Sequence, residues 1–348
     1  MKIKVNSEDL KKIKNLLLVK EMNIAAADAL MEYSYYTNNE SSSDVIEDLK
    51  EFLDLNLSNE EDKTFWDKFI FPCIQEINED KYLSNPYLKM VHPTPLKDKG
   101  YSLEYLSYKP YQIFPYKDIN IHEDYRETSS IGYFKKSYEY LAILKNNNVW
   151  MSLDPNEINT MEGPIKNAKG RVLAFGLGLG YFPFMVSLKD NAKSVTIIEK
   201  DPEIISIFKK HLLMHFPHIE KIHIIQDDAF NYLRNNNVDE LYDYLYADIW
   251  HNAEDGLPLF IRFYDLLKDK KVKVEYWLIE SIIAMLRRCL LTVIEESLNG
   301  ANDSNYQRSK NEYDKIINHL YFKTKNLRFN SYQEILDILS KDNLLKLI

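Results

Sequence analysis

The hydrophobic positions of residues 1–84 recur at helical spacing. Apolar side chains return every three or four residues in three stretches, and a serine that can cap a helix precedes each stretch: Ser7, Ser43 and Ser58. The pattern predicts amphipathic helices whose apolar stripes build a core, and nothing in it indicates catalysis. We therefore expect a helical N-terminal domain over residues 1–84.

Between residues 85 and 164, short β-type runs, prolines and clustered tyrosines replace the helical period. Residues 138–144 and 149–153 flank three asparagines, which tolerate positive φ, so this piece is predicted to be a hairpin. The segment 154–161 that follows is either a plain linker or a flap over a ligand. The tyrosines of residues 101–140 either line a substrate pocket or pack an edge sheet. We expect residues 85–164 to form a β-rich segment that covers the site.

From Gly170 onward, apolar strands alternate with helical stretches. In chain order the pattern predicts strand 171–175, helix 181–188, strand 194–198, helix 203–216, strand 221–226, helix 229–234, strand 242–247, helix 257–267, strand 272–279 and helix 282–297. Such alternation predicts an α/β fold with a Rossmann-like, doubly wound parallel sheet, whose ligand sits beyond the carboxyl ends of the strands. We assign residues 165–300 to this domain and residues 301–348 to a helical C-terminal extension.

Glycine is scarce in this chain, with nine among 348 residues, where average usage would give about 24. Three of the nine, Gly176, Gly178 and Gly180, stand at alternate positions between the first predicted strand and its helix. There the backbone must turn sharply, and a ligand must approach it without a Cβ in the way. A dinucleotide fingerprint would have its third glycine where Tyr181 stands, so the spacing favours S-adenosylmethionine (SAM) over NAD.

Acidic residues end or follow the next three predicted strands. Glu199 ends the second strand, where a carboxylate can accept hydrogen bonds from both hydroxyls of a ribose, a feature that NAD and SAM sites share. Asp228 and Ala229 follow the third strand, where a carboxylate can accept from the exocyclic amine of adenine. Asp248 ends the fourth strand and is expected to face the transferred group.

Residues of about 165–285 resemble the class I SAM-dependent methyltransferases. The resemblance is carried by VLAFGLGLGY, VTIIEKDPEII, IIQDDAFNYL and YDYLYADIW, in the expected order. It implies that the glycines contact the methionine and ribose of SAM, Glu199 the ribose, and Asp228 with Ala229 the adenine. The residues expected at the cofactor are Phe175, Gly176, Leu177, Gly178, Gly180, Tyr181, Glu199, Lys200, Asp228, Ala229 and Asp248.

One position departs from the family pattern. Most members have an acidic residue two positions before the first glycine, and this chain has Ala174. Aminopropyltransferases of the spermidine-synthase type also tend to lack that acid and also have a β-rich segment before the nucleotide domain, although their G-G-G-D-G-G run is absent here. The layout is similar to this spermidine-synthase-like branch, and the predicted activity is methyl transfer from SAM. The alternatives are aminopropyl transfer from decarboxylated SAM and a non-catalytic SAM-fold interaction module.

Asp248 is the candidate catalytic residue, either as a base or as a group that orients the substrate. A carboxylate at this position can also merely cap a helix or bond a loop. The candidate substrate contacts come from the loop after the fourth strand and from the segment 154–161: Trp250, His251, Asp255 and Glu157. Because the sulfonium of SAM is already a good leaving group, the enzyme mainly aligns a nucleophile and removes a proton where needed.

Charge and composition narrow the expected partners. The net charge of −9 repels polyanions, and Ala-Asp-Ile-Trp stands after the fourth strand in place of the Asn-Pro-Pro-aromatic run of amino-methylating nucleic-acid enzymes. We therefore expect a small-molecule substrate and no nucleic acid. Two distant cysteines, a start without a cleavage site and the lack of any membrane-length apolar run predict a cytoplasmic protein without membrane contact. The oligomeric state is not indicated.

Two further clusters have competing interpretations. Four histidines crowd residues 211–223, but zinc ligation needs further converging ligands, so we interpret them as a helix face with its exit loop and expect no metal. Arg287 and Arg288 could contact an acidic substrate, but the solvated edge of an amphipathic helix is the simpler interpretation.

Overall fold

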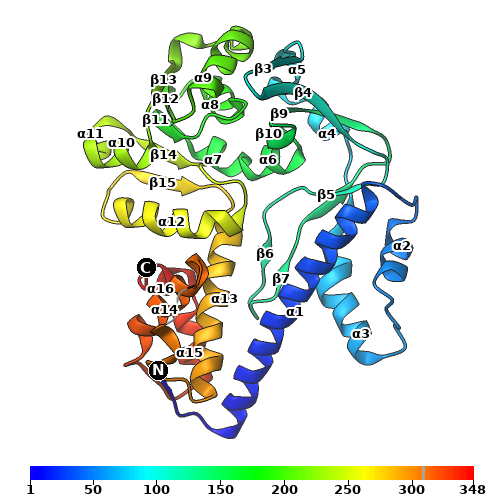
Figure 1. The fold of residues 1–348 in the computed structure, drawn as a ribbon, viewed down its shortest axis with the longest axis vertical. Coiled ribbons are helices and arrows are strands. Elements are labelled where there is room, and N and C mark those ends of the chain that lie inside the picture. The colour runs from blue at the N-terminus through cyan, green and yellow to red at the C-terminus, as the bar shows by residue number, and fades with distance from the viewer. Residues whose placement is uncertain (308–309) are drawn as a thin grey trace.

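The computed structural model describes residues 1–307 and 310–348. Its amino-terminal part is built along α1 (Ser7–Thr37), a helix of 31 residues that runs diagonally through the lower half of the view, with the next two helices of the chain on its outer side (Figure 1). Four shorter pieces pack beside it: α2 (Val45–Phe52), α3 (Glu60–Phe65), the π-helical η1 (Trp66–Ile70) and the 3-10 turn η2 (Phe71–Cys73). Tyr33, Leu49 and Ile70 are fully buried in the core that these elements share.

The expected helices form here, but the three predicted serine caps are wrong. Asn6 accepts a hydrogen bond from the backbone N–H of Asp9, Asp44 from that of Glu47, and Asn59 from that of Glu61. Asparagine and aspartate cap helices as well as serine does. In each case the Asn or Asp next to the serine, and not the serine itself, occupies the N-cap position of the helix.

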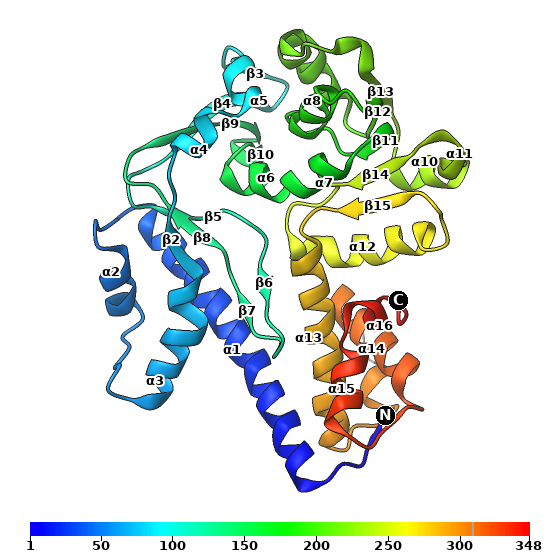
Figure 2. The ribbon, with the colours of Figure 1, turned by 180° about the vertical axis from the view of Figure 1, so that it is seen from behind.

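Short strands make up the segment that follows. The elements are β2 (Ile74–Glu76), α4 (Asp80–Leu83), α5 (Pro86–Met90), β3 (Leu96–Asp98), β4 (Tyr101–Tyr108), β5 (Ile113–Pro115), β6 (Asn120–Ile121), β7 (Glu127–Thr128), β8 (Ile131–Tyr133), β9 (Tyr138–Lys145) and β10 (Asn148–Ser152). The largest sheet has the order β10-β9-β4-β3, while β5 to β8 extend beside α1 (Figure 2). The expected hairpin is confirmed between β9 and β10, where Asn146 and Asn147 turn with φ of 52° and 64°.

The tyrosines of this segment belong to its packing. Tyr108 stacks on Phe114 with ring centroids 4.2 Å apart, and Tyr138 stacks on Phe134 at 4.6 Å. Of the described residues, none of the tyrosines between 101 and 140 lines the cavity that opens at the carboxyl ends of the parallel strands described below. Aromatic packing therefore accounts for their number.

A five-stranded parallel sheet follows two short helices, α6 (Pro155–Thr160) and α7 (Glu162–Asn167). Its strands are β11 (Gly170–Phe175), β12 (Ala192–Glu199), β13 (Ile222–Gln226), β14 (Tyr244–Ala247) and β15 (Lys273–Tyr276), in the order β13-β12-β11-β14-β15. Helices cover both faces: α8 (Tyr181–Ser187), α9 (Pro202–Ile207) with η3 (Phe208–Leu212) and η4 (Leu213–His215), η5 (Ile219–Lys221), α10 (Ala229–Asn235), α11 (Val238–Leu241) and α12 (Ala253–Leu267) (Figure 1). This is the expected doubly wound parallel sheet.

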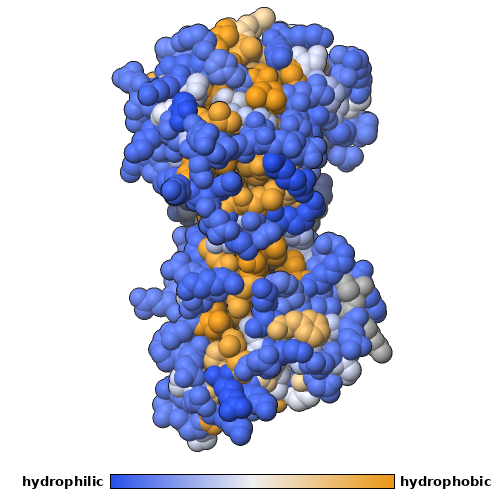
Figure 3. Space-filling view, turned by 90° about the vertical axis from the view of Figure 1, so that its left-hand side faces the viewer, coloured by the Kyte–Doolittle hydropathy of each residue, from blue (hydrophilic) through white to orange (hydrophobic). Residues whose placement is uncertain are grey.

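The fifth strand is shorter than the pattern predicted. It ends at Tyr276 because Leu278 adopts a φ of 50° and turns the chain into α13 (Ile279–Leu298). The remaining elements are η6 (Asn305–Gln307), α14 (Glu312–Thr324), β16 (Arg328–Phe329), α15 (Tyr332–Ile338) and α16 (Lys341–Leu345). β1 (Lys2–Ile3) pairs with β16, so the amino terminus lies beside this carboxyl-terminal helical part. In the space-filling view the molecule has an upper and a lower lobe, with a narrower waist between them (Figure 3).

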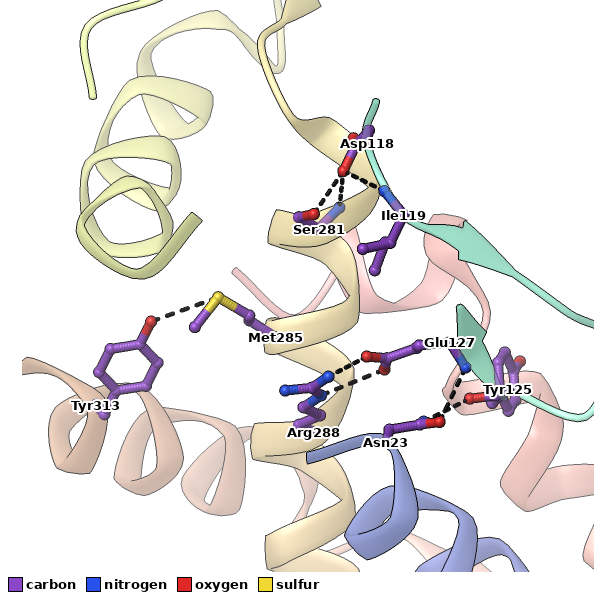
Figure 4. Close-up of polar contacts among 9 residues, drawn as sticks. All are labelled: Asn23, Asp118, Ile119, Tyr125, Glu127, Ser281, Met285, Arg288 and Tyr313. Atoms are coloured by element: carbon purple, nitrogen blue, oxygen red, sulfur yellow. Dashed lines mark hydrogen bonds and ion pairs between the residues drawn. The ribbon is translucent and has the colours of Figure 1, made fainter. Parts of the chain in front are cut away.

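α13 joins these parts through polar contacts that the sequence pattern did not indicate. Arg288 forms an ion pair with Glu127 of β7, and Asp118 accepts hydrogen bonds from the first turn of α13 (Figure 4). Arg287 is only 4% exposed, and its guanidinium lies 4.5 Å from the ring centre of Tyr125. The interpretation of Arg287 and Arg288 as a solvated helix edge is therefore wrong, because the β6-β7 hairpin covers this face of the helix.

Among the described residues, no helix has both the length and the apolar character that a membrane crossing needs.

Candidate functional site

A cavity of about 230 Å³ opens beyond the carboxyl ends of β11, β12, β13 and β14. It lies where the strand order reverses between β11 and β14, which is where open parallel sheets place their ligands. Most of the residues predicted to bind cofactor or substrate line it: Gly176, Leu177, Gly178, Tyr181, Glu199, Lys200, Asp228, Ala229, Asp248, Glu157, Trp250 and His251. The structure thus brings these residues together, and their binding of a ligand stays a prediction.

Three predicted site residues do not line this cavity. Phe175 is fully buried, with its ring edge-to-face against Phe263. Gly180 precedes the first residue of α8. Asp255 accepts hydrogen bonds from the backbone N–H groups of His251 and Asn252, and it completes a capping box at the start of α12. Its carboxylate holds the loop that follows β14.

The glycine turn is shaped by contacts within the protein. Gly176, Gly178 and Gly180 have φ of 94°, 50° and 76°. A Cβ would lie 2.0 Å from the backbone oxygen of Asp248 at Gly176, 1.9 Å from the sulfur of Met151 at Gly178, and 2.2 Å from the ring of Phe208 at Gly180. Each glycine is therefore required by the backbone conformation and by a close neighbour, in addition to any ligand.

Glu199 is fixed between two loops. It is 6% exposed, and its Oε2 accepts the N–H of Leu177 at 3.1 Å while Oε1 accepts the N–H of Asp201 at 2.7 Å. Burial raises the pKa of Glu199, although these backbone donors act in the opposite direction. A carboxylate oxygen has two acceptor positions, so each oxygen can still accept a bond from a ligand hydroxyl.

Asp228 lines the cavity and also has a structural role as the N-cap of α10. Its Oδ1 accepts the N–H groups of Phe230 and Asn231 and so caps α10. Both bonds fall on the same oxygen, which leaves Oδ2 for a donor such as an exocyclic amine. Capping and ligand binding are therefore compatible at this residue.

Asp248 and Glu157 form a carboxylate pair, and in the part of the chain that the structure describes neither has an ion pair with a basic side chain. Both line the cavity and are half-buried. Desolvation raises the pKa of Asp248 to about 7. Desolvation, and then repulsion from Asp248 and Asp154, holds the pKa of Glu157 well above its usual range. The cap of α12 is Asn252, so Asp248 does not serve as that cap.

Several polar atoms of the cavity wall have no partner within the protein. Among the described residues, the Oε2 of Glu157, the hydroxyl of Tyr246 and the indole N–H of Trp250 are buried without a hydrogen bond, and all three residues line the cavity. Buried polar groups in native proteins are nearly always paired. Their grouping here indicates that a ligand or water completes the site.

Glu157 is positioned by the helix that carries it. Asp154 caps α6 by accepting the N–H groups of Asn156 and Glu157, and its other oxygen accepts the hydroxyls of Tyr108 and Ser152. These bonds connect the β-rich segment to α6. The segment 154–161 is therefore not a plain linker: it forms α6, which Asp154 caps, and its residues Glu157 and Met161 line the cavity. That it acts as a flap over a ligand stays a prediction.

Half of the wall consists of residues that the sequence did not indicate: Trp150, Met151, Met161, Phe182, Pro183, Asp227, Phe230, Ile198, Tyr246, Ile249, Leu259 and Trp277. Tyr246 precedes Asp248 by two positions at the end of β14, which could have indicated it. No local signal marks Met151 or Trp277, because they reach the cavity from β10 and from the turn after β15.

The first strand of this domain lies at the centre of the sheet, with the second and third on one side and the fourth and fifth on the other. The glycine turn follows that first strand, and an acidic residue ends the second. The domain has a class I SAM-methyltransferase-like fold.

Comparisons with solved structures give remote matches. Two spermidine synthase structures, one from Thermotoga maritima and one in complex with the transition state analogue AdoDATO, each share 15% identity over 44% of this chain, with TM-scores of 0.32 and 0.33. A structure described as a SAM-dependent methyltransferase from Streptococcus mutans shares 16% identity over 37% of this chain, with a TM-score of 0.26. The matches cover 59%, 60% and 36% of those chains. No family model and no curated protein matches the sequence.

Proposed function

We propose that this protein transfers an alkyl group from an adenosyl sulfonium to a small amine. The proposal rests on the acidic character of the cavity wall. Five carboxylate residues line the cavity, Glu157, Glu199, Asp227, Asp228 and Asp248, against Lys200 and His251. An acidic, partly dehydrated wall attracts cations, and both an adenosyl sulfonium and a protonated amine are cations.

The residues present fit an adenosyl sulfonium. Glu199 would accept from the ribose hydroxyls, the free oxygen of Asp228 would accept from the adenine amine, and the glycine turn would border the sulfonium side chain. When bound, such a cofactor supplies a carbon attached to a good leaving group. The remaining chemistry is left to this chain: to orient the amine and to remove its proton.

Asp248 and Glu157 would perform these two tasks. A protonated amine can donate to both carboxylates, and the unpartnered Oε2 of Glu157 is free to accept. An amine attacks only in its neutral form, so a proton must leave it. Asp248, with its pKa raised to about 7, is a suitable acceptor near neutral pH.

Two alkyl groups are candidates for the transferred group, methyl and aminopropyl. Methyl transfer from SAM is the reaction that the sequence predicted. Aminopropyl transfer from decarboxylated SAM is the second candidate, and Ala174 favours it. This residue is buried within β11, where most members of the resembled family have an acid.

Two measurements test the proposal. Calorimetry with S-adenosylhomocysteine, its decarboxylated analogue and NAD should show binding of an adenosyl thioether. Incubation of SAM or decarboxylated SAM with a panel of small amines, followed by mass spectrometry, should then show a methylated or an aminopropylated amine. Binding of NAD alone would contradict the proposal, and absence of any nucleotide binding would favour the non-catalytic interaction module.

A further inference from the structure

Met151 lies directly on the glycine turn. Its sulfur accepts the backbone N–H of Leu179 at 3.1 Å. The same sulfur lies 1.9 Å from the position that a Cβ of Gly178 would take, so the thioether fills the space in front of this glycine. Met151 also lines the cavity, whereas Leu179 is fully buried. The side chain therefore covers the Leu179 N–H on the side of the cavity.

The backbone of β10 holds Met151 in this place. The pairing of β10 with β9 shifts register between Val149 and Met151, which re-aims the side chains of the strand. Val149 is consequently exposed, and the ring of Trp150 meets that of His251 with centroids 6.3 Å apart. β10 thus bridges the glycine turn and the loop after β14, and Met151 is part of a supported wall.

A backbone N–H at a strand-to-helix glycine turn is a natural donor for an anionic oxygen. A thioether sulfur is a weak acceptor, so it satisfies this N–H only partly. Of the described residues, Lys200 and His251 are the only basic side chains that line the cavity, and the carboxylates of its wall repel an anion. A ligand carboxylate would have to displace Met151 to gain this N–H.

We propose that Met151 is a specificity-determining residue, which makes the site prefer an adenosyl sulfonium whose side chain lacks a carboxylate. The inference rests on the proposed binding of an adenosyl sulfonium. By keeping the Leu179 N–H occupied, Met151 removes the donor that would offset the unfavourable approach of a carboxylate to an acidic wall. A ligand whose side chain carries only an amine does not need the Leu179 N–H as a donor, so its binding is not weakened when Met151 occupies that N–H.

The test compares two ligands that differ only in the carboxylate, S-adenosylhomocysteine and its decarboxylated analogue. By calorimetry, wild-type protein should bind the decarboxylated ligand about ten-fold more tightly, the size expected from one charge-assisted hydrogen bond. Met151→Ala exposes the N–H and should bring the two affinities close together. Met151→Gln places a stronger acceptor on the N–H and should keep or enlarge the preference. Met185→Ala removes a half-buried methionine of α8 that does not line the cavity, and should leave the ratio unchanged.

Circular dichroism shows whether each variant is folded. If Met151→Ala does not fold, Met151→Gln still tests the inference, because it keeps the bulk of the side chain. Equal ratios in wild type and a folded Met151→Ala would overturn the inference alone, as would a fall of the ratio in Met151→Gln. A wild-type preference for S-adenosylhomocysteine would overturn it too. Wild-type protein that binds neither ligand would overturn the proposed function, and the inference with it.

Discussion

Single residues of the glycine turn contact backbone and side chains from other elements, so small changes there have structural consequences. Gly176 has a φ of 94°, and a Cβ would lie 2.0 Å from the backbone oxygen of Asp248. A backbone oxygen cannot rotate away as a flexible side chain can. The turn and the end of β14 must therefore move apart to admit any side chain at this position.

Gly176→Ala should lower the free energy of unfolding by about 2–4 kcal/mol, because it combines backbone strain with a steric clash. Urea denaturation measures the change. Gly163→Ala is the matched control: this glycine lies in α7, and a Cβ there would meet no atom within 4 Å. The control should be neutral or slightly stabilising, and an equal loss in both variants would contradict the argument.

Asp248 should make the stability of the unliganded protein depend on pH. Its pKa is about 7 in the folded protein and roughly 3.9 in an unfolded chain. Between these values the folded state binds more protons than the unfolded state, so the free energy of unfolding falls as pH rises. The decrease begins near the lower pKa and is complete above the higher one.

Asp248→Asn removes this titration, so the variant should be more stable than wild type by about 1–3 kcal/mol at pH 8, with little difference at pH 4. Urea denaturation at both pH values measures it, with the exposed Asp269→Asn as control. The same variant should lose amine transfer by at least about 100-fold if Asp248 is the base. Unchanged turnover would remove Asp248 from the reaction.

At the scale of elements, α6 decides where Glu157 lies. The helix has six residues and is too short to be stable alone. Its position depends on Asp154, which accepts two backbone N–H groups of the helix and the hydroxyls of Tyr108 and Ser152. Loss of Asp154 should therefore affect the position of Glu157 as well as the stability of the fold.

Asp154→Ala should lower the free energy of unfolding by about 1–3 kcal/mol and weaken ligand binding in the cavity. Thermal denaturation and calorimetry measure the two effects. Asp44→Ala removes the cap of α2, far from the cavity, and should lower stability without changing binding. If Asp154→Ala bound ligand as tightly as Asp44→Ala does, α6 would not position the site.

At the scale of the whole molecule, α13 connects the parallel-sheet domain to the amino-terminal helix and its strands. Arg288 of α13 pairs with Glu127, which is 7% exposed, and Asn23 of α1 accepts the N–H of Glu127 (Figure 4). Lys20 of α1 also pairs with Glu295 of α13. These contacts hold α1 and β7 against α13, the helix that follows the last strand of the parallel sheet.

Arg288→Met leaves the carboxylate of Glu127 buried without its cation, which should destabilise the protein by roughly 3 kcal/mol. Hydrogen–deuterium exchange should become faster in α1 and β7 while β11 and β14 remain protected. Lys315→Met breaks an exposed pair with Glu312 and should change neither stability nor exchange measurably. Uniformly faster exchange in Arg288→Met would show that the two parts unfold as one unit.

Much of the sheet domain was predictable because its signals are local. The alternation of strands and helices, the glycine spacing and the acidic strand ends lie within short windows of sequence, and parallel βα units place successive strand ends at one edge. The hairpin at Asn146 and Asn147 was predictable for the same reason. The helix caps were predicted one residue away, because Ser, Asn and Asp compete for the same backbone donors.

The sequence by itself determined the doubly wound sheet and the residues at its strand ends, because backbone geometry and hydrophobic period act between near neighbours. Only the tertiary structure decided which outside elements complete the cavity. Met151 from β10 covers an N–H of the glycine turn, which no sequence pattern indicated. Glu157 was a candidate from the sequence, but only the packing of α6 shows that it lies beside Asp248 in the cavity wall. The burial of Arg287 was likewise decided by the β6-β7 hairpin. Such contacts join segments far apart in the chain, and side-chain packing, which no local pattern encodes, selects them.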